Sequence, residues 1–286
     1  MEKVLVLGVS GKLGGHVLRE LKAAGYYTRA VTRNINDIQH LSEFYNEAIV
    51  ADLTQPDTLN GICDGIDAIF SSAGASLDVR DFSNRQSYYQ IDYQGNKNLL
   101  AQAKSAGIKK FVYVSVFGAR QQRHLEYSDA HEKFVDELKA SGIDYTLLRP
   151  TGFFYVFGEI FNLAKSGMAI QIGNGQSRTN PIHEADLAKV CVAAIQDTEK
   201  EIDVGGPEIF TRRQTAELAF KVLNKSPRII SVPPLMFKGA ATAIRPFNRR
   251  IHALLSFGQE VSLTEIVAPQ IGMRRLEDYY RELANQ

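Results

Sequence analysis

The chain has 286 residues, of which 44% are hydrophobic, and a formal net charge of +1. This size suits one large α/β domain or a domain with a smaller lobe, and the near-neutral charge argues against nucleic acid as a partner. Cys63 and Cys191 lie far apart in apolar surroundings, so we expect reduced, structural thiols. The chain runs directly into an apolar segment, and no apolar run reaches about 18 residues. We therefore expect no signal peptide, no membrane helix and a cytoplasmic protein.

The first 150 residues alternate short apolar runs with amphipathic ones. The apolar runs predict strands at 4–7, 27–32, 48–51, 68–71, 110–115 and 144–149, and the amphipathic runs predict helices at 11–24, 87–106 and 128–141. Gly25, Gly107 and Gly142 each follow a helix, where a left-handed cap favours glycine. Such alternation builds a parallel sheet with helices on both faces. We predict an α/β fold, a doubly wound Rossmann sheet over residues 1–150.

Three glycines, Gly8, Gly11 and Gly14, lie between the first strand and the first helix. Backbone N–H groups can face a pyrophosphate there, because no side chains block the approach and the helix dipole favours an anion. The spacing is not that of the common dehydrogenase fingerprint. It is the place of this turn in the chain that predicts a bound dinucleotide, and the alternative is a turn whose glycines serve packing alone.

The second and third strands bear on which dinucleotide is bound. The second ends at Arg33, where enzymes that use NAD usually carry an acidic residue. A guanidinium can pair with the 2′-phosphate of NADP, so we predict NADP and leave NAD open; a solvated arginine is the alternative. Asp52, which precedes Leu53, can accept from the adenine amino group or cap the helix near Pro56, or do both.

After Pro150 the pattern loosens. Residues 153–157 are aromatic and uncharged, helices are predicted at 184–195 and 211–223, and a short strand is predicted at 228–232. Thr211 is a suitable N-cap. We predict that residues 151–286 form a smaller α/β substrate lobe packed on the core, with elements returning to the sheet.

Several of these segments together resemble one family. The glycine turn, Thr32-Arg33-Asn34, Ala51-Asp52-Leu53 and residues 141–152 are similar to the atypical branch of the short-chain dehydrogenase/reductases, in particular to its NmrA-like and complex-I-accessory-subunit-like NAD(P)-binding members. Residues 181–188 and 205–211 extend the resemblance to about residue 230. It implies a Rossmann fold, a nicotinamide cofactor and a small substrate lobe. It fixes no reaction, because the branch includes reductases, epimerase-like enzymes and cofactor sensors without catalysis.

Active members of this superfamily use a Tyr-x-x-x-Lys pair on one helix. The resemblance places Tyr127 at the tyrosine and His131 at the position of the lysine, which lowers the tyrosine pKa and holds the ribose. A histidine can donate to the ribose or act as a general acid near neutrality; alternatively, it is a polar helix residue without chemistry. Many relatives carry two consecutive serines, and the one nearer the substrate polarises the carbonyl; here Ser115 remains, shifted or kept, and Val116 replaces the second. Asp92 replaces a structural asparagine.

Loops after the fourth and sixth strands are expected to complete the site. Small residues at Ala73 and Gly74 let the backbone pass close to the ribose and nicotinamide, and in relatives the turn at 150–153 contacts the carboxamide. The aromatic residues at 153–157 either line an apolar substrate pocket or pack as core. Residues 76–87 form a charged loop that could close over the site.

Two features further along the chain allow competing interpretations. His183 and Asp186 predict a helix-start network rather than a metal site, since no third ligand lies at metal spacing. Residues 234–257 mix apolar and basic residues and could lie on an anionic membrane or meet a partner. Because Pro246 breaks the apolar face, we expect instead that one face packs on the protein and the other is solvated.

The sequence therefore predicts an NADP-dependent oxidoreductase of the atypical short-chain type that acts on a small apolar carbonyl, enone or quinone. The alternative is a non-catalytic NAD(P)-binding redox sensor or assembly factor, and a homodimer or protein partner stays open. A sugar-nucleotide epimerase or dehydratase is disfavoured by the incomplete tetrad. The catalytic candidates are Tyr127, His131 and Ser115, and no metal is expected. The candidates for cofactor binding are Gly8, Ser10, Gly11, Lys12, Leu13, Gly14, Arg33, Asp52, Leu53, Ala73, Gly74, His131, Pro150, Thr151, Gly152 and Phe153.

Overall fold

The computed structural model describes residues 1–83 and 85–286, and the chain divides into two compact units. The first comprises Met1–Leu77, Gln86–Arg149 and Leu187–Ile202. The second comprises Asp78–Arg85, Pro150–Asp186 and Asp203–Gln286. The charged loop expected at 76–87 contains Asn84, which lies outside the described residues.

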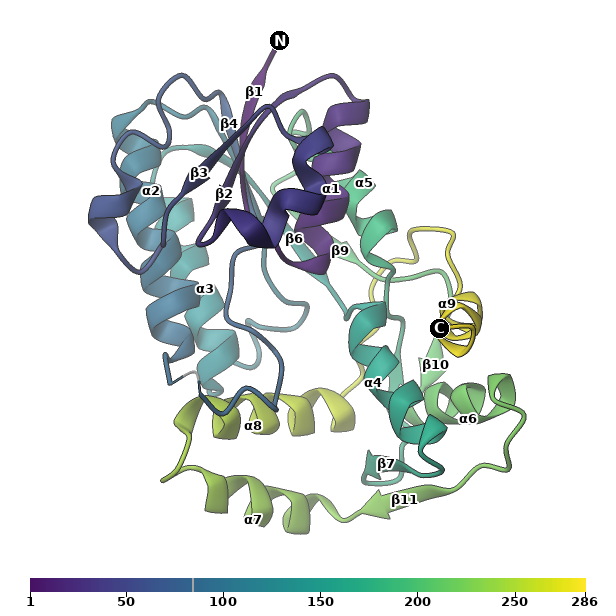
Figure 1. Cartoon of the computed structure of the whole chain (residues 1–286). Coiled ribbons are helices and arrows are strands. Elements are labelled where there is room, and N and C mark those ends of the chain that lie inside the picture. Colours follow the sequence, from purple (N-terminus) through teal and green to yellow (C-terminus); the bar gives the residue numbers. More distant parts are fainter. Residues whose placement is uncertain (84) are drawn as a thin grey trace. The chain divides into compact units, whose positions relative to one another are not determined.

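A seven-stranded sheet has the order β3-β2-β1-β4-β5-β6-β9 (Figure 1). Parallel pairing joins β1 to β2 and β4, β2 to β3, and β5 to β4 and β6. The strands are β1 Lys3–Leu7, β2 Tyr27–Thr32, β3 Glu47–Val50, β4 Ala68–Ser71, β5 Lys110–Val114, β6 Asp144–Pro150 and β9 Glu201–Val204. The predicted doubly wound Rossmann sheet is confirmed, with its six predicted strands. The order reverses between β1 and β4, and in such sheets ligands bind beyond the carboxyl ends of the strands at that point.

Helices cover both faces of this sheet. In Figure 1, α2 (Asn96–Ser105) and α3 (Glu126–Ala140) lie on one side, and α1 (Lys12–Ala23) and α5 (Glu184–Ala193) lie on the other. Two 3₁₀ helices, η1 (Ile35–Phe44) and η2 (Pro56–Leu59), connect strands. The prediction of one regular helix over 87–106 is wrong in its first turns, because η3 (Tyr89–Gly95) is a π-helix. Gly25, Gly107 and Gly142 have the predicted left-handed backbone, with φ of 81°, 70° and 82°.

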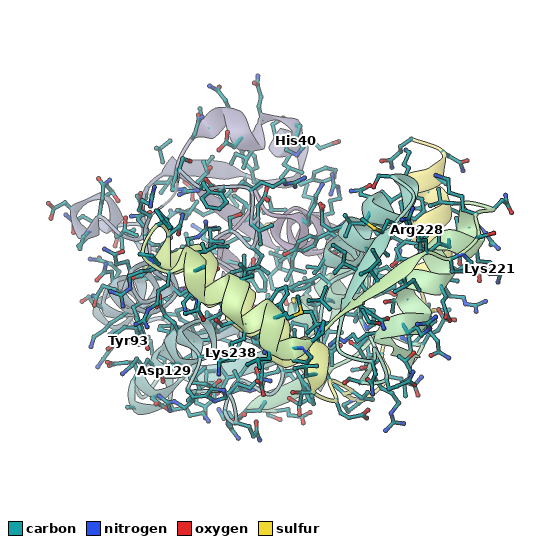
Figure 2. All side chains as sticks on the ribbon, turned by 90° about the horizontal axis from the view of Figure 1, so that it is seen from below. His40, Tyr93, Asp129, Lys221, Arg228 and Lys238 are labelled. Atoms are coloured by element: carbon teal, nitrogen blue, oxygen red, sulfur yellow. The ribbon has the colours of Figure 1, made fainter. Side chains whose placement is uncertain are left out.

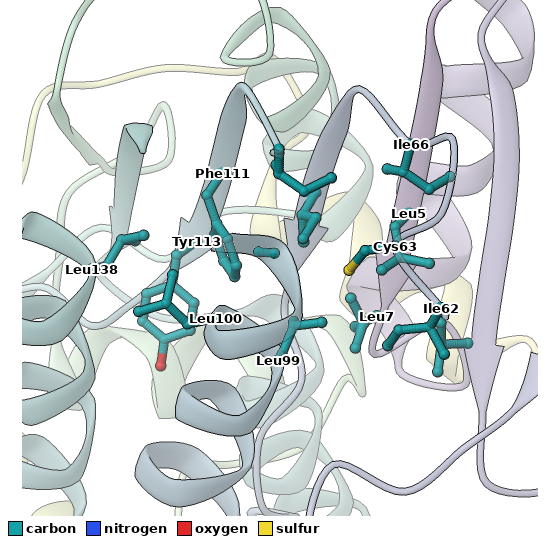
Figure 3. Close-up of a cluster of buried hydrophobic side chains, with 14 of the residues drawn as sticks. Leu5, Leu7, Ile62, Cys63, Ile66, Leu99, Leu100, Phe111, Tyr113 and Leu138 are labelled. Carbon is teal, nitrogen blue, oxygen red and sulfur yellow. The ribbon is translucent and has the colours of Figure 1, made fainter. Parts of the chain in front are cut away.

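The core of the first unit lies between the sheet and the helices α2 and α3. Figure 3 shows Leu5 and Leu7 of β1 and Phe111 and Tyr113 of β5 with their side chains in this cluster. Residues two apart on a strand share a face, so Leu5 with Leu7 and Phe111 with Tyr113 enter the same cluster, although both faces of these strands are buried. Cys63 belongs to the same cluster, and burial raises its pKa to about 12. Both cysteines are free and buried, as predicted.

The described residues of the second unit form two small sheets and five helices. Strand β7 (Ala169–Ile172) pairs in parallel with β11 (Ile229–Val232), and β8 (Arg178–Thr179) pairs antiparallel with β10 (Phe210–Thr211). Thr211 caps α6 in a capping box with Gln214, as predicted. The helices are α4 Phe154–Lys165, α6 Arg212–Val222, α7 Pro234–Ile244, α8 Arg249–Leu263 and α9 Leu276–Ala284. Within the described ranges, no helix combines the length and the apolar character needed to cross a bilayer.

Candidate active site

The turn between β1 and α1 has no room for a side chain at Gly8 or Gly14. A Cβ added at Gly14 would lie 2.1 Å from the carbonyl oxygen of Gly8, and one added at Gly8 would lie 2.7 Å from the hydroxyl of Ser72. Gly8 also has a left-handed φ of 82°. The N-cap of α1 is Gly11, and no side chain caps the helix. The first N–H groups of α1 are therefore left for an outside acceptor, and the bare backbone fits the pyrophosphate of a dinucleotide.

Arg33 stands at the end of β2 with an unengaged guanidinium. Its side chain is exposed and makes no hydrogen bond or ion pair with any residue in the described ranges. The same holds for Ser10 and Lys12 in the glycine turn, both of which are exposed, whereas Leu13 is buried and can offer only its backbone. These polar groups are therefore available to a charged ligand.

Asp52 shapes the turn after β3. Its Oδ1 accepts from the backbone N–H and the hydroxyl of Thr54, each at 2.8 Å, in an Asx turn. The nearby helix η2 has Gln55 as its N-cap and no side-chain bond there, so the expectation that Asp52 caps this helix is wrong. The carbonyl of Leu53 accepts from Asn98, which ties this turn to α2.

A buried polar chain runs from β5 to the loop after β4. The hydroxyl of Tyr113 lies 2.7 Å from Nδ1 of His131, and Nε2 of that histidine lies 3.4 Å from Asp92 Oδ1. The backbone N–H of Ala75 donates to the same carboxylate. A Cβ at Gly74 would lie 2.6 Å from Asp92 Oδ1, so glycine is required for the loop to approach this acid.

His131 is neutral in this setting. Burial, with a smaller contribution from the charge of Arg149, lowers its pKa to about 3. Burial also holds the pKa of Tyr113 well above its ordinary value, so that hydroxyl keeps its proton. The proton of the ring belongs on Nε2, because that nitrogen faces the Asp92 carboxylate, and Tyr113 donates to Nδ1. The structure thus differs from the expectation that His131 titrates near neutrality.

Asn96 also holds the loop after β4, and the sequence did not identify it as a site residue. It is fully buried, accepts from the hydroxyl of Ser71 at 2.8 Å, and donates to the carbonyls of Ala73 and Asp92. Its position one turn after Asp92 on a helix was the available signal. Asp92 and Asn96 together fix the backbone at Ala73 and Gly74, the expected contacts for the ribose and nicotinamide half of a cofactor.

Tyr127 lies in the first turn of α3, between two aromatic rings. Its ring is 8% exposed and meets Tyr88 and His131 edge-on, each with centroids 4.9 Å apart. This packing fixes the direction of the phenol. Tyr127 and His131 share a helix face, as the four-residue spacing predicts.

Ser115 lies beside a buried ion pair that the sequence analysis did not identify. Arg149 donates to Glu132 at 2.5 Å, and the two side chains are only 5% and 3% exposed. The hydroxyl of Ser115 lies 3.5 Å from Glu132 and 3.4 Å from Arg149. The pair therefore joins the ends of β5 and β6 to α3, and Ser115 is held at that junction.

The turn after β6 belongs to the second unit. Thr151 donates to the carbonyl of Asn180 at 2.6 Å, and Phe153 pairs with Ile182. Phe154 and Phe157 are buried in the core of this unit, so they are packing residues rather than pocket residues.

Phe153 and Tyr155 are half-buried and stack on each other, with centroids 5.6 Å apart. Pro150 and Gly152 flank Thr151 in the same turn, and Pro150 ends β6. Of the four aromatic side chains, these two are the ones left with a face for an apolar ligand.

His183 acts at the start of α5, as predicted, whereas the Asp186 side chain bonds to the segment before α9. His183 Nδ1 accepts from the N–H of Ala185 at 3.0 Å, and Asp186 accepts from the N–H groups of Met273 and Arg274. Among the described residues, no group of acidic, histidine and cysteine side chains could hold a metal ion.

The segment Asp78–Arg85 is bound to the start of α8. Arg250 donates to the carbonyl of Asp81, and Asn248 donates to that of Phe82. Arg85 donates to the carbonyl of Phe247. Three residues of the charged loop expected as a lid, Asp81, Phe82 and Arg85, are thus held by hydrogen bonds within the second unit.

Comparison with known proteins gives a consistent family. Residues 8–198 match the model of the NAD(P)H-binding family. The chain is 29% identical over 249 residues to divinyl chlorophyllide a 8-vinyl-reductase of Cucumis sativus, a match that covers 80% of this chain and 59% of that protein. It is 26% identical to the photosystem II assembly factor Ycf39 of Guillardia theta, covering 94% of this chain and 86% of the factor. The chain thus spans about 60% of the length of the vinyl reductases that it matches.

Solved structures support the fold. The NADPH-dependent quinone oxidoreductase of Escherichia coli, complexed with NADPH, superimposes with a TM-score of 0.77 at 19% identity, covering 99% of this chain and 100% of that one. The triphenylmethane reductase of Citrobacter sp. gives 0.79 at 17% identity, with full coverage of both chains. The family model covers most of the sheet and also the glycine turn, whose geometry fits a dinucleotide. The chain therefore belongs to the NAD(P)H-binding family, within the atypical short-chain dehydrogenase/reductases.

Proposed function

We propose that this protein is an NADP-dependent oxidoreductase that reduces a small, apolar, conjugated substrate such as an enone or a quinone, or a related carbonyl. The observation that carries the proposal is the glycine turn, whose bare backbone and uncapped helix N-terminus stand on the same sheet edge as the unengaged Arg33. The relatives include a vinyl reductase, and the structural neighbours include a quinone oxidoreductase and a triphenylmethane reductase. The names of these proteins give a vinyl group, a quinone and a triphenylmethane compound as what they act on.

The chain's own residues have separate tasks in this proposal. The N–H groups of Lys12, Leu13 and Gly14 bind the pyrophosphate, and Arg33 pairs with the 2′-phosphate. When bound, the reduced nicotinamide supplies a hydride. Tyr127, oriented by Tyr88 and His131, provides the proton for the substrate oxygen or carbon.

The further contacts predicted from the resemblance complete the proposal. Ser115 orients the carbonyl group of the substrate, and the backbone at 73–74 and 150–153 contacts the nicotinamide half. His131 acts on the ribose side through Asp92 and the loop after β4, since its ring is neutral and faces that acid.

Tyr127→Phe tests the catalytic part. We expect kcat to fall on the order of 100-fold, because a positioned general acid is lost, while the Kd for NADPH stays within about twofold. Steady-state rates and fluorescence titration measure the two quantities. Tyr93→Phe is the matched control, since its hydroxyl bonds to Glu137 on α3 and has no proposed role. An unchanged kcat in Tyr127→Phe would remove this tyrosine from the mechanism.

Arg33→Ala tests the choice of cofactor. Losing charge-assisted hydrogen bonds to a phosphate costs roughly 1.5–3 kcal/mol, so the Kd for NADPH should rise roughly 10- to 100-fold while that for NADH changes little. Isothermal titration with both cofactors measures this. Arg228→Ala, at another exposed arginine, should affect neither. Equal losses for NADPH and NADH would contradict the assignment.

The second candidate function is a non-catalytic NAD(P)-binding assembly factor. One observation favours it: a buried, neutral histidine stands at the position where active members of the superfamily carry a charged lysine. The similarity to Ycf39 over 94% of this chain agrees with it. Tight NADPH binding without turnover of any enone, quinone or aldehyde would select this candidate.

A further inference from the structure

Helix α7 packs on one face alone and leaves the other in solvent. Of its residues Pro234–Ile244, Ala241 is the one that is buried. Its neighbour in the second unit is α8, which follows after the turn at Arg245–Asn248. Figure 2 looks at the face on which α7 lies, with Lys238 labelled on it. This is the arrangement expected from the sequence: Phe237, Ala241 and Ile244 are buried or half-buried on one face of α7, and the opposite face is open to solvent.

The exposed part of α7 carries large apolar side chains. Leu235 is 81% exposed, Met236 is 67% exposed, and Phe247 in the following turn is 72% exposed. Three such side chains within 13 positions are unusual for a surface that faces only water, because exposing apolar side chains to water is unfavourable. They are flexible or aromatic groups that can enter an apolar phase.

The charge of the same region has one sign. Residues 218–259 contain no aspartate or glutamate and seven basic residues, in a chain whose formal net charge is only +1: Lys221, Lys225, Arg228, Lys238, Arg245, Arg249 and Arg250. Lys238, Arg245 and Arg249 are exposed and flank the apolar side chains. An acidic surface would therefore be attracted, and a second copy of this basic segment would be repelled in a symmetric contact.

The length of the helix sets how it could meet a bilayer. The 11 residues of α7 extend roughly 16 Å at about 1.5 Å per residue, about half of the hydrocarbon thickness. Such a helix cannot cross, but it can lie in the interface with its apolar side chains inserted and its basic ones at the headgroups.

We propose that α7 and the following turn, residues 234–249, dock the protein on the surface of an anionic lipid bilayer. Leu235, Met236 and Phe247 insert among the acyl chains, and Lys238, Arg245 and Arg249 bind the acidic headgroups. The docking is peripheral and reversible, since one short helix with three inserted side chains gives modest affinity. It does not depend on the proposed oxidoreductase activity.

Vesicle co-sedimentation of the full chain tests this. We expect binding to phosphatidylcholine vesicles that contain roughly 30% phosphatidylglycerol, weak binding to pure phosphatidylcholine, and release by high salt. The triple variant Leu235→Ser, Met236→Ser, Phe247→Ser should bind about tenfold more weakly or worse. Met273→Ser is its control, because Met273 is 88% exposed elsewhere in the second unit.

A charge-reversed pair separates headgroup binding from insertion. Lys238→Glu with Arg249→Glu should weaken binding to the anionic vesicles at least tenfold, at roughly fivefold for each charge removed and more for each reversed. Lys22→Glu with Lys104→Glu makes the same change in net charge at exposed positions of the first unit and should bind like wild type. Thermal melting checks that each variant is folded.

Three results would overturn the proposal. The first is wild-type protein that binds neither kind of vesicle. The second is control variants that lose binding as much as the α7 variants do. The third is a wild-type dimer in sedimentation analysis that the triple variant turns into a monomer, because the occupant of this surface would then be a second copy.

Discussion

Gly14→Ala is expected to abolish NADPH binding and to destabilise the first unit. The added Cβ would lie 2.1 Å from the Gly8 carbonyl oxygen, well inside van der Waals contact, and the clash is with backbone that cannot rotate away. Either α1 moves off the turn or the turn opens, and both displace the N–H groups meant for the pyrophosphate. We expect the Kd for NADPH to rise on the order of 100-fold or more and the free energy of unfolding to fall by about 2–4 kcal/mol.

Gly15→Ala is the matched control for this change. It is the next residue of the same helix, and its Cβ would meet Leu41 at 3.5 Å, an ordinary contact. Alanine favours a helix over glycine by about 1 kcal/mol, so this variant should bind NADPH normally and be as stable as wild type or more so. Fluorescence titration measures the Kd for NADPH, and urea denaturation measures the free energy of unfolding, in both variants. Full NADPH affinity in Gly14→Ala would mean that the turn does not hold the cofactor.

Breaking the buried pair of Glu132 and Arg149 is expected to lower the free energy of unfolding at least as much. Removing one member leaves an uncompensated charge in a site where both side chains are 5% exposed or less, and such losses cost about 3–5 kcal/mol. Glu201 lies 3.5 Å from Arg149, so Glu132→Gln leaves the arginine with a second carboxylate and should sit at the lower end of that range. Arg149→Met leaves Glu132 with Arg120 at the longer distance of 3.9 Å, and the Arg120 side chain is half exposed, so this variant should cost more.

The double variant distinguishes a coupled pair from two independent residues. Glu132→Gln with Arg149→Met should cost less than the sum of the single changes by roughly 1–3 kcal/mol, because neither charge is then left alone. Arg213→Ala breaks an exposed pair with Glu217 and should cost no more than about 0.5 kcal/mol. Free energies from urea denaturation measure all four variants. Strict additivity in the double variant would contradict direct coupling.

Most of the first unit could be predicted from the sequence because its signals are local. A strand buried on both faces is an apolar run, and the glycines at 25, 107 and 142 mark helix ends by their backbone conformation. The secondary structure of the second unit was predicted less completely from the sequence. The aromatic start of α4 has no polar face to reveal a helical period, and its side chains Phe154 and Phe157 serve the core. How far Leu235 and Met236 of α7 stay exposed depends on tertiary contacts that no local pattern records.

The site divides in the same way. The glycine turn and Arg33 could be found because backbone clearance and a charge at a strand end are visible in the sequence. The polar chain of Tyr113, His131 and Asp92 could not, because it joins three elements that are distant in sequence. Burial also changed the chemistry expected of His131, since desolvation removes the charged form that a solvated imidazole would offer near neutrality.

The most direct test of the account is turnover, followed as loss of NADPH absorbance against a panel of quinones, enones and aldehydes, with NADH in parallel. If the protein is an NADP-dependent oxidoreductase, we expect saturable oxidation of NADPH by at least one of these substrate classes and a much lower kcat/KM with NADH. The rate should fall in Tyr127→Phe. Tight binding of NADPH without its oxidation by any of these substrate classes would contradict the proposed oxidoreductase activity. It would favour the second candidate, a non-catalytic NAD(P)-binding assembly factor.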